Sequence, residues 1–169
     1  MAHFSRSYVV VLLCVLLYIG VNRCFPREVR PTRPLLGPVI FLATGFGSLG
    51  ALFPHAGDVD LFVTVVAVAV GAAFGWLHAR RWALQYRRGR DGLLVRLPGD
   101  PSLLAMIVVT FAAESFMHYA VESGQPWAAT GAFAAMSYAL WGVLVGMPLG
   151  RGLNVAMRCA QYANGLRVG

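Results

Sequence analysis

The stretch SLLAMIVVTFAAESFMHY, residues 102–119, is apolar enough to enter a membrane, although Glu114 and His118 lie near its C-terminal end. Thr110, Glu114 and His118 recur every four residues, so on a helix they form one polar stripe. The other long apolar runs of the chain contain no acidic residue. The stretch therefore predicts a membrane-spanning helix, and its acid is the first candidate for a functional group.

The composition extends this prediction to the whole chain. Of the 169 residues, 58% are hydrophobic and 12% are charged, whereas a soluble domain has about 25% charged residues. We expect an all-α, polytopic membrane protein that forms one integral membrane domain over residues 1–169. Its five expected spans are residues 7–22, 35–53, 61–78, 102–120 and 127–149.

The arginines predict the orientation of these spans. All fourteen basic residues are arginine, and the net charge is +7. With the N-terminus outside, the basic loops 23–34 and 79–100 and the tail 150–169 are cytoplasmic, and only Arg6 remains outside. The positive-inside rule favours this arrangement, and the reverse would export thirteen arginines. The excess positive charge is thus explained by arginines that flank the membrane spans on the cytoplasmic side. We therefore expect no nucleic-acid partner.

Two polar segments carry weaker structural predictions. In the loop 79–100, Asp91-Gly92 followed by LLVRL indicates a turn and a short strand. In the tail 150–169, Leu153, Met157 and Ala160 fall on one side of a helix that continues the fifth span.

Glu114 has three interpretations. An ionised carboxylate at the bilayer centre costs about 2.5–3.5 kcal/mol, and less near the surface. Glu114 could be a helix–helix anchor that is hydrogen-bonded to a neighbour such as Ser48 or Tyr138. Alternatively, Thr110, Glu114 and His118 could relay protons or cations, or His118 could bind a metal or haem together with His55 or His3. The anchor is the interpretation that we favour.

Two further sets of residues are candidates for packing and for lipid contact. Glycines four residues apart allow close helix packing, within the protein or between copies; they are Gly71 with Gly75, and Gly142 with Gly146. The second set could contact lipid phosphates or simply fix the topology; it comprises Arg80, Arg81, Arg87, Arg88 and Arg90.

We predict no catalytic residue, no metal and no cofactor. The sequence contains no nucleophile triad, phosphate-binding loop, HExxH motif or paired carboxylates. Cys14, Cys24 and Cys159 have no metal-ligand spacing, and from the predicted topology we expect no disulfide framework. His78 and His118 lie at opposite faces of the membrane in this topology, so they cannot share one haem.

The order of these features resembles an uncharacterised family of small bacterial inner-membrane proteins, known only as a domain of unknown function. The matching features are listed here in chain order: a short first span, a Gly47-Ser48-Leu49-Gly50 step, Gly71 and Gly75, Leu97-Pro98-Gly99, Phe116 with Tyr119, and Gly150-Arg151. The resemblance implies a location in the bacterial inner membrane and supplies no activity. In that family a basic residue often stands at the position of His118.

The function that we expect is that of a small integral membrane protein that acts as a structural or accessory component. Its partners would be the lipid bilayer and either further copies of the chain or another membrane protein. The alternative is a minimal transporter or proton-coupled carrier that uses Glu114 and His118.

Overall fold

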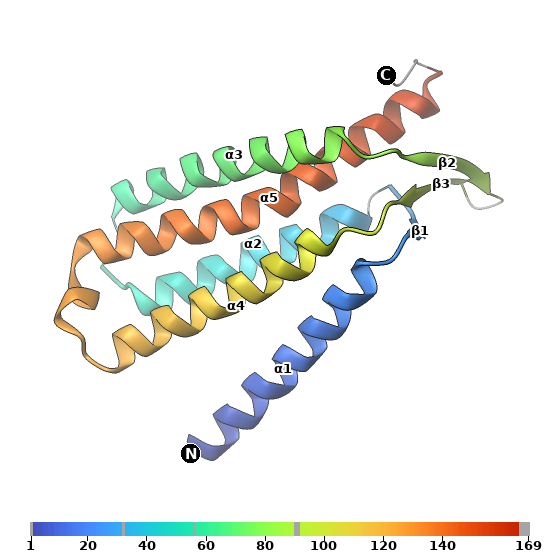
Figure 1. The fold of residues 1–169 in the computed structure, drawn as a ribbon. Coiled ribbons are helices and arrows are strands. Elements are labelled where there is room, and N and C mark those ends of the chain that lie inside the picture. The colour runs from blue at the N-terminus through green and yellow to red at the C-terminus, as the bar shows by residue number, and fades with distance from the viewer. Residues whose placement is uncertain (1, 32, 56, 90–91, 166–169) are drawn as a thin grey trace.

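The computed structural model describes residues 2–31, 33–55, 57–89 and 92–165, with the backbone alone described for residues 2–10, 12, 44, 88–89 and 92. This part of the chain forms five helices and a small sheet at one end of them (Figure 1). The elements in chain order are α1 (Ala2–Arg23), β1 (Arg27–Val29), α2 (Arg33–Leu52), α3 (Asp58–Arg80), β2 (Gln85–Gly89), β3 (Gly92–Leu97), α4 (Pro101–Glu122), η1 (Pro126–Ala129) and α5 (Gly131–Ala163).

Helices α2, α3, α4 and α5 are each long and apolar enough to cross a membrane. They coincide with four of the five expected spans. The described side chains of α1 form a shorter apolar segment, Leu13–Arg23. This helix packs against α4, where Gly20 lies against Leu104, and it diverges from the bundle toward its N-terminus (Figure 1).

A three-stranded antiparallel sheet corrects the expected all-α fold. The strand order is β1-β3-β2. Strand β3 contains the predicted LLVRL strand, and its pairing with β2 extends to Gly89 and Gly92, where a turn was predicted. Strand β1 was not predicted, because Pro26 and Pro31 leave only a short strand in the basic loop. Prolines at both ends are compatible with an edge strand of three residues.

Helix α5 corrects the boundaries of the fifth expected span. Residues 126–129 form the short 3-10 helix η1, and α5 begins after Thr130, whose Oγ1 accepts a hydrogen bond from the Phe133 N–H at 3.3 Å. The helix continues to Ala163, as the tail pattern predicted. Its 33 residues span about 50 Å, whereas the hydrocarbon core of a bilayer is about 30 Å thick. The C-terminal turns of α5 therefore extend beyond what a membrane can cover.

Helices α3 and α5 form the closest helix pair of the bundle and lie side by side in parallel (Figure 1). A Cβ atom added to Gly71 would meet the backbone of Val143, and one added to Gly75 would meet the backbone of Met147. Because both partner atoms belong to the backbone, only glycine allows this separation of the two helices.

A second contact joins α2 and α4 to another face of α5. The ring of Trp141 lies against Gly45, and Phe46 packs edge-on against it with ring centroids 5.1 Å apart. Leu49 and Met117 are buried in the same apolar cluster. The bundle thus has a glycine contact between α3 and α5 and an aromatic contact between α2, α4 and α5.

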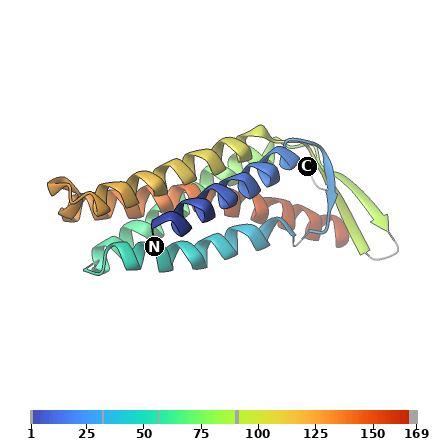
Figure 2. The same cartoon turned by 90° about the horizontal axis from the view of Figure 1, so that it is seen from below.

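The two ends of the bundle differ in structure and charge. The sheet lies beyond the helix ends, beside the C-terminal turns of α5 (Figures 1 and 2). The loops that carry most of the arginines meet at this end, which we call the sheet end. The opposite end consists of the short connections between α2 and α3 and between α4 and α5, where Asp58, Asp60 and Glu122 lie.

Candidate functional site at the sheet end

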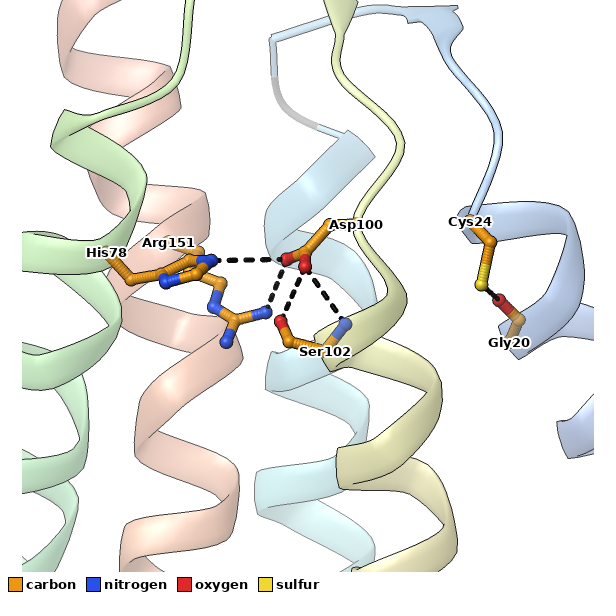
Figure 3. Close-up of polar contacts among 6 residues, drawn as sticks. All are labelled: Gly20, Cys24, His78, Asp100, Ser102 and Arg151. Carbon is orange, nitrogen blue, oxygen red and sulfur yellow. Dashed lines mark hydrogen bonds and ion pairs between the residues drawn. The ribbon is translucent and has the colours of Figure 1, made fainter.

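A single carboxylate connects several elements at the sheet end (Figure 3). Asp100 is the N-cap of α4, and its Oδ1 accepts hydrogen bonds from the Ser102 N–H at 3.0 Å and the Ser102 hydroxyl at 2.6 Å. Its Oδ2 accepts a hydrogen bond from Nη1 of Arg151, on α5, at 2.8 Å. We call Asp100, Ser102, Arg151 and His78 the Asp100 junction.

The Asp100–Arg151 ion pair is shielded from solvent. The side chain of Arg151 is 5% exposed and that of Asp100 is 13% exposed. In this environment the mutual attraction of the two groups offsets their loss of hydration, and either group alone would be strongly unfavourable. Arg151 lies twenty residues beyond Gly131, at about 30 Å along α5, a distance similar to the thickness of the hydrocarbon core of a bilayer.

The junction also includes α3 and the end of α1. His78, near the C-terminus of α3, places Nε2 at 3.7 Å from Asp100 Oδ2. The Asp100 backbone N–H donates a hydrogen bond to the carbonyl oxygen of Arg23, the last residue of α1, at 3.2 Å. The preceding Gly99 lies against the backbone of Cys24, too close for a Cβ atom. One residue therefore contacts all three of α1, α3 and α5 from the start of α4.

The extension of α5 supports the sheet just beyond the junction. Val95 and Leu97 of β3 pack with Val155 and Cys159 of α5 in a buried cluster. The Nη1 of Arg158 donates a hydrogen bond to the Trp82 carbonyl oxygen at 3.0 Å. These contacts hold the sheet against the C-terminal turns of α5.

An aromatic pair also joins strand β2 to the C-terminal turns of α5. The rings of Tyr86 on β2 and Tyr162 on α5 are stacked, with centroids 4.4 Å apart and an interplanar angle of 11°. Burial raises the pKa of Tyr86, which the positive charge of Arg158 partly offsets. The phenol therefore stays protonated and neutral at physiological pH.

The predicted polar stripe is not assembled into a network. Thr110 and Glu114 are half-buried on α4, whereas the His118 side chain is 47% exposed. His118 Nδ1 lies 4.0 Å from Oε1 of the exposed Glu122, one turn further along α4. Within the described residues, the Glu114 carboxylate has neither a hydrogen bond nor an ion pair, so the expected bonds to Ser48, Tyr138 or His118 are absent there.

The four predicted packing glycines meet in one contact within the chain. Gly71 and Gly75 come from α3, and Gly142 and Gly146 come from α5. An added Cβ at Gly146 would meet the Val68 carbonyl oxygen, and one at Gly142 would come within 2.8 Å of the Ala67 Cβ. Gly150 continues the series against Ala72. The glycines therefore pack α3 against α5, and homodimerisation is not needed to explain their spacing.

The arginines proposed for lipid contact lie at the sheet end. Arg80 is the last residue of α3, and Arg81 and Arg87 follow it; all three are exposed. Arg90 and the side chain of Arg88 lie outside the described residues.

The histidines proposed as metal ligands do not belong to a cluster of three or more possible metal ligands in the described residues. His55 lies between α2 and α3, and His118 lies near the end of α4, both at the end opposite the sheet. The side chain of His3 lies outside the described residues. No group of three or more His, Cys, Asp or Glu side chains close enough to hold a metal occurs in the described part of the chain.

The sequence contained signs of the Asp100 junction that the prediction did not use. Asp100, Pro101 and Ser102 follow the usual pattern of a helix start, with an N-cap acid and proline at the first helical position. Arg151 directly follows an apolar run and is the charge nearest to it. The pairing itself could not be predicted, because the two residues are 51 positions apart.

The chemistry of the junction favours a structural role. Ser102, His78 and Asp100 are residue types found in hydrolytic sites, but here the hydroxyl is bonded directly to the carboxylate and the imidazole contacts the same carboxylate. The imidazole is therefore not placed to act as the base for this hydroxyl, as it would be in a nucleophile triad. Searches of protein-family models, curated proteins and solved structures gave no match to this chain.

Proposed function

We propose that this chain is a structural or accessory component of a membrane, whose bundle presents the sheet end as a fixed platform at the membrane surface. The observation that carries the proposal is the Asp100 junction. Its buried charges are used to join helices, and α3 and α5 are packed too closely to leave a path between them. Its partners would be the bilayer together with another membrane protein or further copies of the chain.

The proposed membrane arrangement has five spans, including α1, with the N-terminus outside and the sheet end in the cytoplasm. The gathering of arginines at the sheet end supports this orientation through the positive-inside rule. Cysteine labelling in a variant without the three native cysteines tests it. Arg87→Cys should react only with reagent that reaches the cytoplasm, and His55→Cys should react with impermeant reagent outside. The reversed pattern would overturn the orientation.

We place the protein in the bacterial inner membrane. The motifs from Gly47-Ser48-Leu49-Gly50 to Gly150-Arg151 resemble those of the uncharacterised inner-membrane family, and this resemblance is what supports the location. Membership of the family is itself part of the proposal.

A proton-coupled carrier is the second candidate. The half-buried Glu114 favours it, because within the described residues this carboxylate has no bonded partner and so is available to exchange a proton or bind a cation. Thr110 and His118 would extend its path along α4. The exposed position of His118 and its proximity to Glu122 make this candidate the weaker one.

One pair of variants separates the two candidates. Glu114→Gln removes the charge but keeps the shape of the side chain, and Asp100→Asn does the same at the junction. For a structural component, Glu114→Gln should leave both abundance and proton or cation flux in proteoliposomes unchanged, whereas Asp100→Asn should lower the amount of folded protein. Loss of an ion-dependent flux in Glu114→Gln at normal abundance would establish the carrier instead.

A further inference from the structure

A hollow with a volume of about 360 Å³ lies at the sheet end, between the end of α1, strand β1 and the start of α2. Three arginines line it: Arg23 ends α1, Arg27 lies on β1 and Arg33 begins α2. The chain between α1 and α2 turns back through β1 (Figure 1). The three arginines, which come from three elements, thereby line one hollow. We call this hollow the arginine concavity.

The arginine concavity has an excess of positive charge that the protein does not balance. Arg23 and Arg27 are half-buried, and no ion pair joins any of the three arginines to a carboxylate in the described part of the chain. Burial lowers the pKa of Arg27, and the nearby Arg23 lowers it further. An anion bound there would relieve both the repulsion and the loss of hydration.

Glu28 is the one carboxylate in the lining, and it does not neutralise the arginines. Successive side chains of a strand point to opposite faces. In β1, Arg27 and Val29 are half-buried while Glu28 is exposed. Glu28 also lines a separate hollow over the outer face of β2 and β3 together with Arg87 and Arg96. It therefore lies at the edge that the two hollows share.

The remaining neighbours of the concavity are apolar. Leu36, one turn into α2, also lines it and is 60% exposed, and Val39 follows on the same helix with 53% exposure. An apolar helix surface thus starts directly beside the arginines. A free inorganic anion would use only the charges, whereas a phospholipid would place its phosphate among the arginines and its acyl chains along α2.

We propose that the arginine concavity binds the phosphate headgroup of an anionic phospholipid. Guanidinium groups bind phosphate through paired, charge-assisted hydrogen bonds, and three of them converge here from three elements. The bound lipid would join α1 to α2, two helices that are otherwise connected through β1. This proposal rests on the membrane placement of the chain and is independent of the structural or accessory role.

The test measures lipid retained by the full chain purified in a mild detergent, with added phosphatidylglycerol, phosphatidylcholine or inorganic phosphate. Native mass spectrometry counts the adducts, and thermal unfolding reports stabilisation. The wild type should retain phosphatidylglycerol in preference to phosphatidylcholine and be stabilised by it, with no stabilisation by inorganic phosphate. Each of Arg27→Gln and Arg33→Gln should lower phosphatidylglycerol binding about fivefold.

Arg30→Gln is the matched control, because Arg30 is an exposed arginine of the same loop that does not line the concavity. It should bind phosphatidylglycerol like the wild type. Arg33 is exposed at the start of α2, so its substitution keeps the test valid if Arg27→Gln fails to fold. Equal binding by wild type and both variants, an equal loss in Arg30→Gln, or equal stabilisation by inorganic phosphate would each overturn the proposal. None of these results depends on whether the protein is a structural component or a carrier.

Discussion

The two charged regions of the bundle differ in how their charges are accommodated. At the sheet end, Asp100 accepts hydrogen bonds from Ser102 and Arg151, and the ion pair is almost fully buried. On α4, Glu114 is half-buried without a bonded partner in the described residues, and His118 lies at an exposed position. The comparison shows that the residue most unusual in the sequence need not be the one that organises the structure.

Removing the charge of Asp100 should produce the largest effect. Asp100→Asn retains an N-cap residue but leaves Arg151 buried without its counter-charge, so it should lower the free energy of unfolding by about 3 kcal/mol. Chemical denaturation in detergent micelles measures this value. Asp58→Asn, the same substitution at an exposed position in α3, is the control and should cost less than about 1 kcal/mol. Equal losses of unfolding free energy in Asp100→Asn and Asp58→Asn would show that Asp100 contributes no more than an ordinary residue at a helix start.

The glycine contact between α3 and α5 should give the next largest effect. In Gly75→Ala, the new Cβ would meet the Met147 backbone, and forcing the helices apart should cost about 1–3 kcal/mol. Gly50→Ala is the control, because nothing lies within 4 Å of an added Cβ there. That variant should be neutral or slightly stabilising, since alanine favours a helix by about 0.5–1 kcal/mol over glycine.

A substitution in the polar stripe of Thr110, Glu114 and His118 should have the smallest effect on the free energy of unfolding. Because Glu114 has no bonded partner in the described residues, Glu114→Gln should change the free energy of unfolding by less than about 0.5 kcal/mol. The same denaturation assay measures it. A loss comparable to that of Asp100→Asn would show that Glu114 anchors a helix after all, as the sequence first indicated.

Helix positions were predictable from the sequence because long apolar runs report directly on burial or on membrane insertion. The predicted strand LLVRL was confirmed as part of β3, which begins at Gly92. Strand β1 was missed because Arg27–Val29 is too short and too polar to show a pattern. It is stabilised by contacts distant in sequence, namely its pairing with β3 and the packing of Val29 on the buried cluster of β3 and α5.

The site was less predictable than the fold, for a physical reason. The cost of a charge within a span can be estimated from one residue, so Glu114 was conspicuous. The pairing of Asp100 with Arg151 depends on which helix ends meet, and that is set by the packing of α3, α4 and α5. The arginine concavity has the same origin, because it combines the end of α1, strand β1 and the start of α2.

A double-mutant cycle on Asp100 and Arg151 tests the central claim most directly. The free energies of unfolding of Asp100→Asn, Arg151→Gln and the double variant are compared with that of the wild type in the same micelles. If the ion pair joins α4 to α5, the loss in the double variant should be about 2 kcal/mol smaller than the sum of the single losses. Losses that add to within about 0.5 kcal/mol would contradict the account, because the two side chains would then act independently.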